Sequence, residues 1–242
     1  METYTQPEGG APEDLNIILR ALGRLRESSN CESVLFQKPR GFQFASGGWI
    51  DIRFLSAELA TGRTFSVASS PTESDLRITY KRGRSPFKVQ LQSCRPGDVV
   101  LITQQGSNEL VFDKSAPAVF IAGGVGIAPF RSILKEAVDY QERLPITLVH
   151  VDRADADFPF REEILSWRGE WPELKTHFVA TEREGRLTRD GLERLIGADV
   201  QDASVLAYVA GPPGMVKSTE VLLTQIGVAG DRIRKDQFDG YQ

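Results

Sequence analysis

The amino-acid sequence predicts an antiparallel β-barrel domain followed by an α/β domain with a parallel sheet. The chain has 242 residues, enough for two compact domains at roughly 100 to 200 residues each. Hydrophobic residues make up 40% of it and charged residues 26%, values that suit a packed core and exclude a largely disordered chain. The pattern of apolar residues changes near residue 114. We therefore expect a flexible tail at 1–14, a β-barrel domain at 15–113 and an α/β domain at 114–242.

The first domain has the pattern of a series of short strands. Its apolar residues come in brief, often alternating runs that Gly, Pro, Ser and Asn separate. Alternation with a period of two places every second side chain on one face of a sheet. Short strands with frequent turn residues are typical of an antiparallel barrel or sandwich. The clearest runs fall at 34–36, 49–54, 76–80 and 98–102.

The second domain has a different pattern. Continuous apolar runs, typical of strands buried on both faces, alternate with amphipathic segments. In the segment 129–143, apolar residues recur at helical spacing and share one face. Strands that alternate with helices form βαβ units and a parallel sheet. The expected strands are 118–122, 146–149, 176–180 and 205–209, and the expected helices are 129–143, 160–167, 188–196 and 213–226.

Composition and charge exclude several classes of protein. No stretch approaches roughly 18 consecutive apolar residues, so no transmembrane helix is expected. The polar start at 1–14 lacks the apolar core of a secretory signal, and we expect a cytoplasmic protein. The net charge of −4 argues against a nucleic-acid partner. Two cysteines and two histidines are too few for a zinc or iron–sulfur site, and we expect no bound metal.

Two glycine-rich segments each follow a predicted strand and open a predicted helix. The first is GGVGIAP at 123–129 and the second is AGPPGM at 210–215. Glycines let the backbone approach a bulky ligand, and a helix N-terminus offers unpaired N–H groups to a phosphate. Ligands of a parallel sheet bind beyond the carboxyl ends of its strands, so both segments could line one crevice. A tight strand–helix turn explains each segment equally well on its own.

Two segments of the first domain have features of a phosphate or ring site. Arg63 could pair with a phosphate, and Phe65, on the same strand face, could stack on a flat ring. Ser85 is suited to cap a helix that has Pro86 at its first position, and the N-terminus of that helix could hold a pyrophosphate. Arginine and serine are also common at ordinary strand and helix ends, so each segment alone is weak evidence.

Together and in this order, the four segments resemble the ferredoxin–NADP reductase-like flavoproteins. RTFS at 63–66 is similar to that family's RxYS flavin motif, with Phe in place of Tyr. GGVGIAP is similar to its GGxGIxP nucleotide motif, GPPGM at 211–215 to its GPxxM motif, and SPFK at 85–88 to the SxFK segment of one subgroup. QFDGY at 237–241 is similar to the ExFxGY ending of some bacterial members. The resemblance runs from about Leu15 to Tyr241.

The resemblance implies a barrel that holds FAD, or less often FMN, and a parallel-sheet domain that binds NAD(P)H. It implies that the nicotinamide passes hydride to the flavin N5 and that electrons then leave for a separate acceptor protein. An iron–sulfur domain within this chain would need cysteines that the sequence lacks. Family members serve ferredoxins, flavodoxins, cytochromes, oxygenases and haem domains, and nothing in this sequence selects among them.

Carried onto this sequence, the family motifs imply three sets of site residues. The candidate catalytic residues are Ser66, near the flavin N5, and Phe238, which with Tyr241 is a candidate to cover the outer face of the rings. The candidate flavin-binding residues are Arg63, Thr64, Phe65, Ser66, Thr79, Tyr80, Lys81, Gly83, Arg84, Ser85 and Tyr241. The candidate nucleotide-binding residues are Gly124, Gly126, Ile127, Arg153, Gly211, Pro212 and Met215.

The sequence leaves the choice between NADH and NADPH open. Arg153 follows the predicted strand at 146–151 and could bind the 2′-phosphate of NADPH, as could Arg183 and Arg186. Asp152 could instead bind the ribose hydroxyls of NADH and repel that phosphate. Asp152 and Arg153 could also be solvated loop residues.

Two other functions fit the same motifs. A reductase of free flavin would share the fold, although Arg63 and the segment around Ser85 would then have no phosphate to hold. A regulatory subunit that binds flavin or nucleotide is the third hypothesis, because Ala128, Ala210 and Gln237 replace the Thr, Cys and Glu that are frequent in the family. Those family side chains lie near the nicotinamide, so their replacement bears on the rate of hydride transfer.

Overall fold

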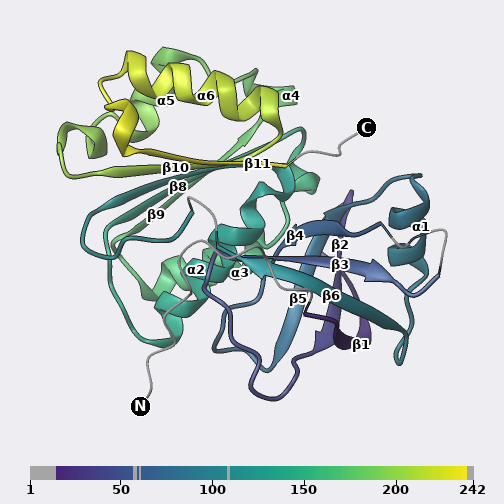
Figure 1. The fold of residues 1–242 in the computed structure, drawn as a ribbon. Helices are drawn as coiled ribbons and strands as arrows, with labels where there is room; N and C mark the ends of the chain where they lie inside the picture. The colour runs from purple at the N-terminus through teal and green to yellow at the C-terminus, as the bar shows by residue number, and fades with distance from the viewer. Residues whose placement is uncertain (1–14, 57–58, 60, 108–109, 239–242) are drawn as a thin grey trace.

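The computed structural model describes residues 15–56, 59, 61–107 and 110–238, and it contains two β-sheets (Figure 1). The strands of the first sheet are β1 (Ile17–Arg26), β2 (Cys31–Gln37), β3 (Trp49–Phe54), β4 (Arg63–Ser66), β5 (Asp75–Lys81) and β6 (Val99–Gly106). They pair antiparallel in the order β4-β3-β6-β1-β2-β5. The predicted antiparallel sheet is confirmed, whereas the proposed division of the chain at residue 113 stays a prediction.

The first sheet curls until its two edge strands approach each other. Val67, directly after β4, forms an antiparallel bridge with Ile78 of β5. The N–H of Ala68 also donates to the carbonyl of Arg77, with 2.7 Å between nitrogen and oxygen. In β3, alternate side chains fill the interior, as the predicted period of two requires. The short helix α1 (Pro86–Ser93) packs Phe87 into the same core.

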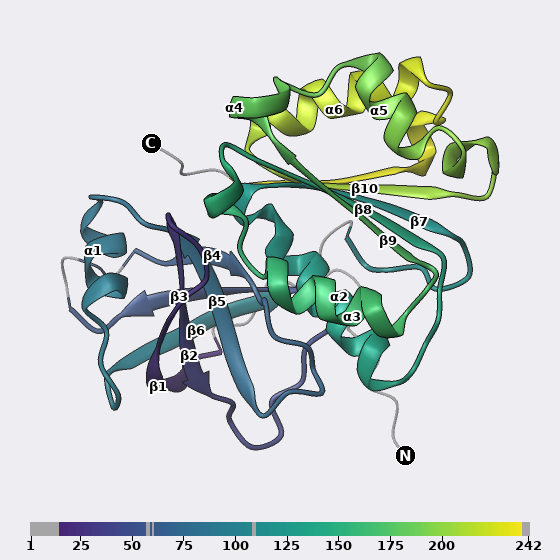
Figure 2. The same ribbon diagram turned by 180° about the vertical axis from the view of Figure 1, so that it is seen from behind.

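The second sheet is parallel and has helices on both faces (Figures 1 and 2). In β7, Phe120 packs on the side of α2 and α3, whereas its neighbours Val119 and Ile121 pack on the side of α5 and α6. Burial on both faces explains why these strands are continuously apolar in the sequence. The strands are β7 (Ala118–Gly123), β8 (Ile146–Asp152), β9 (Leu174–Ala180), β10 (Leu206–Gly211) and β11 (Ile233–Gln237), in the order β11-β10-β7-β8-β9, and the helices are α2 (Ile127–Asp139), α3 (Arg161–Glu170), α4 (Thr181–Glu184), α5 (Arg189–Ile196) and α6 (Pro213–Gln225).

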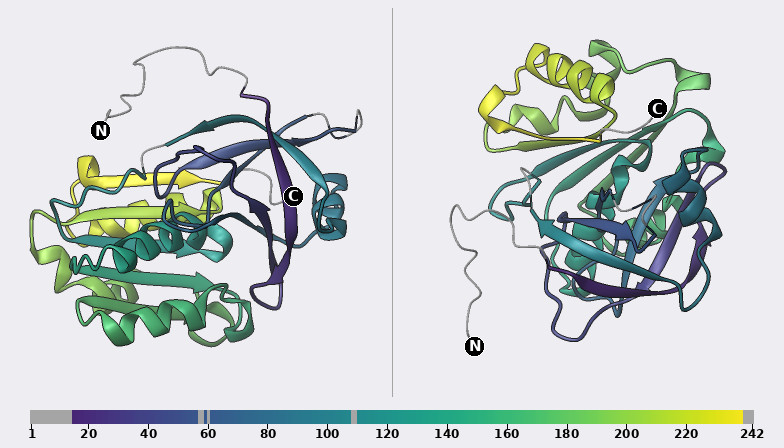
Figure 3. Two further views of the ribbon diagram at one scale, coloured as in Figure 1. Left: turned by 90° about the horizontal axis from the view of Figure 1, so that it is seen from below. Right: turned by 45° about the vertical axis from the view of Figure 1, so that its right-hand side comes forward.

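A buried ionic contact joins the two sheets. Helices α2 and α3 lie between the parallel sheet and the curled sheet (Figure 3). The side chain of Arg131 in α2 is only 2% exposed and forms ion pairs of 2.5 Å with Glu73, in the turn before β5, and with Glu163 of α3. It also donates to the carbonyl of Ala68. Because a buried charge is stable only when it is paired and hydrogen-bonded, this contact holds the two sheets in one arrangement.

Two strands, β1 and β11, were not predicted from the sequence. In β1 the alternation is interrupted by a register shift between Ala21 and Gly23, so its apolar residues do not keep one period. β11 is a charged edge strand with the sequence IRKDQ, which lacks the apolar pattern of a buried strand. Within the described residues no helix is both long and apolar enough to cross a membrane, and no group of ligand side chains could hold a metal ion.

Candidate functional site

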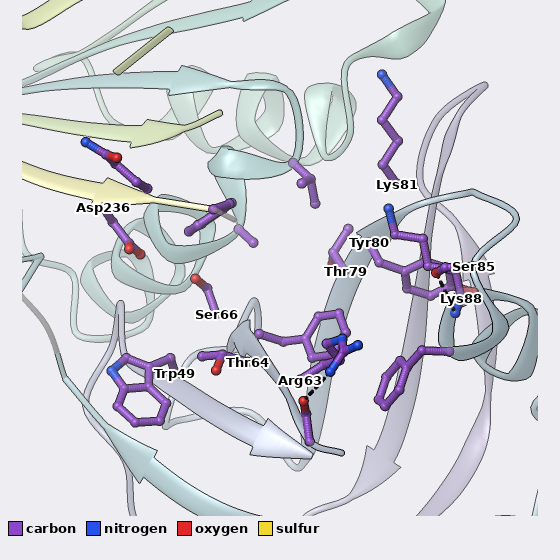
Figure 4. Close-up of a pocket in the computed structure, with 17 residues that line it drawn as sticks. Trp49, Arg63, Thr64, Ser66, Thr79, Tyr80, Lys81, Ser85, Lys88 and Asp236 are labelled. Atoms are coloured by element: carbon purple, nitrogen blue, oxygen red, sulfur yellow. Dashed lines mark hydrogen bonds between the residues drawn. The ribbon is translucent and has the colours of Figure 1, made fainter. Parts of the chain in front are cut away.

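A cavity of about 510 Å³ opens where the rim of the curled sheet faces the start of α2 and the end of β11 (Figure 4). One wall is formed by strands β3, β4 and β5 and the start of α1. The other is formed by residues at the start of α2 and the end of β11, in the domain of the parallel sheet. The volume lies in the range of cofactor sites, roughly 300 to 1,000 Å³. The lining residues are Trp49, Gly62, Arg63, Thr64, Phe65, Ser66, Thr79, Tyr80, Lys81, Ser85, Phe87, Lys88, Val125, Ala128, Asp236, Gln237 and Phe238.

One part of the cavity is rich in positive charge. Arg63 begins β4, Lys81 ends β5 and Lys88 lies in α1, and all three line the cavity. Burial and the neighbouring Lys81 lower the pKa of Lys88. The guanidinium of Arg63 lies 5.9 Å from the ring centre of Phe87 and forms no ion pair with any described carboxylate. Ser85 caps α1 by accepting a hydrogen bond from the N–H of Lys88, and because Pro86 has no N–H, Phe87 supplies the remaining backbone donor of this first turn. These groups could hold a diphosphate.

Another part of the cavity is aromatic. Phe65 of β4 stacks on the ring of Phe87 at 6.0 Å between centroids. Ser66 lies opposite Trp49 in the β3–β4 pair, and Figure 4 shows the Ser66 hydroxyl directed toward the open space. Phe238 reaches the cavity from the other sheet, where its N–H donates to the carbonyl of Gly211 at 3.0 Å. Flat rings and a hydroxyl at this position could bind a heteroaromatic ring.

The strand β5 forms the wall between these two parts. The hydroxyls of Thr79 and Ser33 lie 2.7 Å apart and share a hydrogen bond within the curled sheet. Tyr80 donates its hydroxyl to Glu32 at 3.1 Å, and burial together with the charge of Glu32 raises the pKa of the phenol. The polar ends of both side chains are therefore held by the protein, which makes β5 a rigid wall.

The two glycine-rich turns touch each other beside this cavity. A Cβ on Gly126 would lie 2.3 Å from the carbonyl oxygen of Ala210, and a Cβ on Gly211 would lie 3.1 Å from the backbone of Gly123. The glycines thus allow one turn to approach the other, a role that the sequence could not separate from ligand approach. Pro212 and Met215 stand against Gly123 and fill the other side of the contact.

The turn after β7 is also held from β8. His150 is fully buried, and its Nε2 lies 2.9 Å from the carbonyl oxygen of Gly124, which has a positive φ of 55°. Burial lowers the pKa of this imidazole to about 4, so the ring is neutral at neutral pH, and the geometry makes Nε2–H the donor. Asp152 lies on the same face of β8, and its carboxylate is next to Gly124. At this position His150 is part of the core and also supports the turn.

Most of the predicted flavin residues line one cavity, but the predicted nucleotide residues do not. Gly83 and Arg84 lie in the turn before α1 and are not among the lining residues, and Tyr241 lies outside the described residues. Gly124, Gly126, Ile127, Gly211, Pro212 and Met215 form the two turns beside the cavity, and Arg153 follows β8 on the surface. Their roles stay predictions. The cavity is also lined by residues that the sequence did not indicate: Trp49, Phe87, Lys88, Val125 and Asp236. Strand register and the approach of β11 cannot be predicted from local patterns.

The sequence that forms most of the parallel sheet is similar to a known domain family. Residues 120–220 match the family model of the oxidoreductase NAD-binding domain. Flavohemoprotein A of Dictyostelium discoideum is 27% identical, over 89% of this chain and 58% of its own length. The ferredoxin–NAD(P)(+) reductase component of naphthalene 1,2-dioxygenase/salicylate 5-hydroxylase systems from a Ralstonia species is also 27% identical, over 81% of this chain and 61% of its own length. The chain thus spans about three fifths of the length of these two relatives.

Solved structures share the fold of both sheets. A ferredoxin NADP+ reductase from Neisseria gonorrhoeae with bound FAD and NADP has a TM-score of 0.79 at 19% identity, over 91% of this chain and 98% of that one. The flavohem-like FAD/NAD binding domain of nitric oxide dioxygenase from Vibrio cholerae has a TM-score of 0.77 at 17% identity, over 94% of this chain and 99% of that one.

Proposed function

We propose that the chain, as a member of the ferredoxin–NADP reductase-like family, is an NAD(P)H-dependent FAD oxidoreductase that serves a separate electron acceptor. The observation that carries the proposal is the cavity of about 510 Å³ between the two sheets. It combines an aromatic part, a set of hydroxyls and a cluster of cations, and two glycine-rich turns stand beside it. This order of groups matches a flat heteroaromatic ring, a polyhydroxyl chain and a diphosphate.

The side chains of the cavity fit FAD. The cations Arg63, Lys81 and Lys88 supply more positive charge than one phosphate needs, which favours the diphosphate of FAD over FMN. Arg63 has no carboxylate partner among the described residues, so a phosphate would give this guanidinium a strong ligand. Thr64 would supply a hydroxyl group along the polyhydroxyl chain, and Thr79 would form part of the wall beside it.

The ring would lie between residues of the two sheets. In this arrangement Phe65 packs against the rings from the curled sheet, and Phe238 covers them from the end of β11. Ser66 stands where its hydroxyl can donate to a ring nitrogen, the role that its motif implies. Two aromatic walls bury a large apolar plane and keep water away from the reacting atoms.

The nicotinamide would reach the ring beside the two glycine-rich turns. The contact between the turn at Gly126 and the carbonyl of Ala210 fixes both loops at the edge of the cavity. Phe238, held by its N–H on Gly211, would have to move aside for the nicotinamide to stack. When bound, FAD supplies the chemistry that converts hydride transfer from NAD(P)H into electron delivery to the acceptor.

Anaerobic reduction tests this proposal. The purified chain is expected to retain FAD. Stoichiometric NADH or NADPH, added without oxygen, should reduce the flavin and so bleach its visible absorbance. A chain that retains FAD but is reduced by neither nucleotide would refute the oxidoreductase reading and favour a regulatory subunit. A colourless chain that binds FAD only weakly but turns over added flavin would favour the free-flavin reductase.

A further inference from the structure

We propose that this chain selects NADH over NADPH, because carboxylates surround the place where the 2′-phosphate of NADPH would lie. This inference rests on the proposed function and names the nucleotide that the enzyme would use as its hydride donor. It assigns the choice to Asp152 at the end of β8 and to Glu182 in α4.

The topology of the sheet gives the direction of the nucleotide. Parallel sheets bind ligands beyond the carboxyl ends of their strands, next to the point where the strand order reverses, here between β7 and β10. The cavity for the flavin ring lies on the β11 side of this point, since Gln237 and Phe238 line it. The nicotinamide must meet that ring, so the adenosine half extends the other way, over the ends of β8 and β9.

Asp152 is placed to accept hydrogen bonds from a ribose. One carboxylate oxygen accepts from the N–H of Arg153 at 2.7 Å, whereas the other lies beside Gly124 in the first glycine-rich turn. Burial, helped by the nearby charge of Asp157, raises the pKa of Asp152 to about 6, although the N–H of Arg153 and the charge of Lys81 act in the opposite direction. A partly buried carboxylate that forms no ion pair gains most from donors such as ribose hydroxyls, and it repels a dianion.

Two arginines at this edge, Arg153 and Arg183, are each accompanied by carboxylates. Arg153 pairs with Glu182, with 2.6 Å between Nε and Oε1. Arg183 pairs with Asp155 and, at 2.8 Å, with Glu184. A phosphate that approached either guanidinium would therefore also approach a carboxylate of its own sign.

Exposed ion pairs are weak, so the pairing alone would not keep a phosphate away. The local balance of charge does more. The segments 152–157 and 181–184 hold five acidic residues and two arginines. Arg161, which pairs with Asp155 at 3.6 Å, adds a third arginine, so the acidic residues remain in excess. NADH adds no phosphate at the 2′ position and offers two hydroxyl donors there, which suits this balance.

Binding of the oxidised nucleotides to the FAD-loaded protein tests the inference without turnover. Calorimetric titration is expected to give a Kd for NAD+ at least tenfold lower than that for NADP+, with the same order in the KM values for NADH and NADPH. An equal or tighter affinity for NADP+ would overturn the inference while leaving the proposed function standing. If neither nucleotide binds or reduces the flavin, the proposed function itself fails.

Two variants locate the effect. Glu182→Gln is expected to tighten NADP+ binding about three- to tenfold and to leave NAD+ binding unchanged, because it removes one of the repelling charges. Asp152→Ser is expected to weaken NAD+ binding about fivefold or more by removing the ribose acceptor. Glu170→Gln is the matched control, since it makes the same charge change on an exposed residue at the end of α3. Selectivity that shifts equally in the control, or in no variant, would overturn the assignment to these residues.

Discussion

Replacing Arg63 with alanine is expected to weaken FAD binding about 30-fold while leaving the fold intact. A hydrogen bond to a charged group contributes about 1.5–3 kcal/mol, and a guanidinium can donate two to a diphosphate. Arg63 lies at the exposed rim of the cavity, where solvent screens both bonds. We therefore take about 2 kcal/mol for the pair, and 1.4 kcal/mol for each factor of ten in Kd gives about 30-fold.

The structure predicts little change in stability for the same variant. The described contacts of the Arg63 side chain are a hydrogen bond to the carbonyl of Gly62 at 2.9 Å and a distant contact with the ring of Phe87. Losing them leaves no buried charge without a partner, so the midpoint of thermal unfolding should stay within a few degrees, about 3 °C.

Titration of the flavin-free protein with FAD, followed by quenching of flavin fluorescence, measures the effect. Arg63→Lys keeps the charge but loses the two-pronged geometry, and an intermediate Kd is expected. Arg53→Ala is the matched control, because Arg53 of β3 is half-buried and does not line the cavity. A Kd for Arg63→Ala within threefold of the parent, or an equal loss in Arg53→Ala, would refute the assigned role.

Three further predictions concern buried groups. Arg131→Met should lower the free energy of unfolding by about 2–3 kcal/mol, measured by urea denaturation, because Glu73 and the buried carbonyl of Ala68 lose their donor while Glu163 keeps Arg77. A loss below about 1 kcal/mol would contradict this. His150→Phe should raise the Kd for NAD+ several-fold and leave FAD binding unchanged, because it removes the donor to the carbonyl of Gly124. His150→Gln should restore part of the affinity for NAD+, since its amide can donate to the same carbonyl. Equal effects on both ligands would show a merely structural role. Asp152→Asn should raise the free energy of unfolding at pH 7.5 but not at pH 4. The pKa of Asp152 in the folded protein, about 6, exceeds its unfolded value, so ionisation of this carboxyl destabilises the fold as the pH rises from about 4 to 6. An equal gain at both pH values in urea denaturation would contradict this explanation.

The fold was predictable because its two sheets obey two simple periods. Alternating runs such as 49–54 lie in a sheet with one buried face, and continuous runs such as 118–122 lie in a sheet covered on both faces. The helix at 213–226 was predicted within one residue of its observed end at Gln225, and Ser85 does cap α1 as its position before Pro86 predicted. Strand β11 was missed because its five residues are mostly polar and only their place beside β10 makes them a strand.

The site was predictable in its residue types and less so in its contacts. Motif residues such as Arg63 and Ser66 do line one cavity, which their separation along the chain from Phe238 could not show. Local patterns also gave no sign that Arg153 is paired with Glu182, because Arg153 follows β8 and Glu182 belongs to α4. Pairing of this kind depends on the register of β8 against β9, which is set by tertiary packing.

The glycines of the two turns show why a motif and a packing requirement need not be alternatives. Gly126 approaches Ala210 so closely that no side chain fits, and Gly124 has a backbone conformation that favours glycine. Both features bring the N–H groups at the start of α2 to the edge of the cavity, and His150 holds the turn there from below. A turn that must pack this tightly against its neighbour is rigid before any ligand arrives, and a rigid site loses less entropy on binding. The packing of the turns is therefore a reason to expect a ligand at this position.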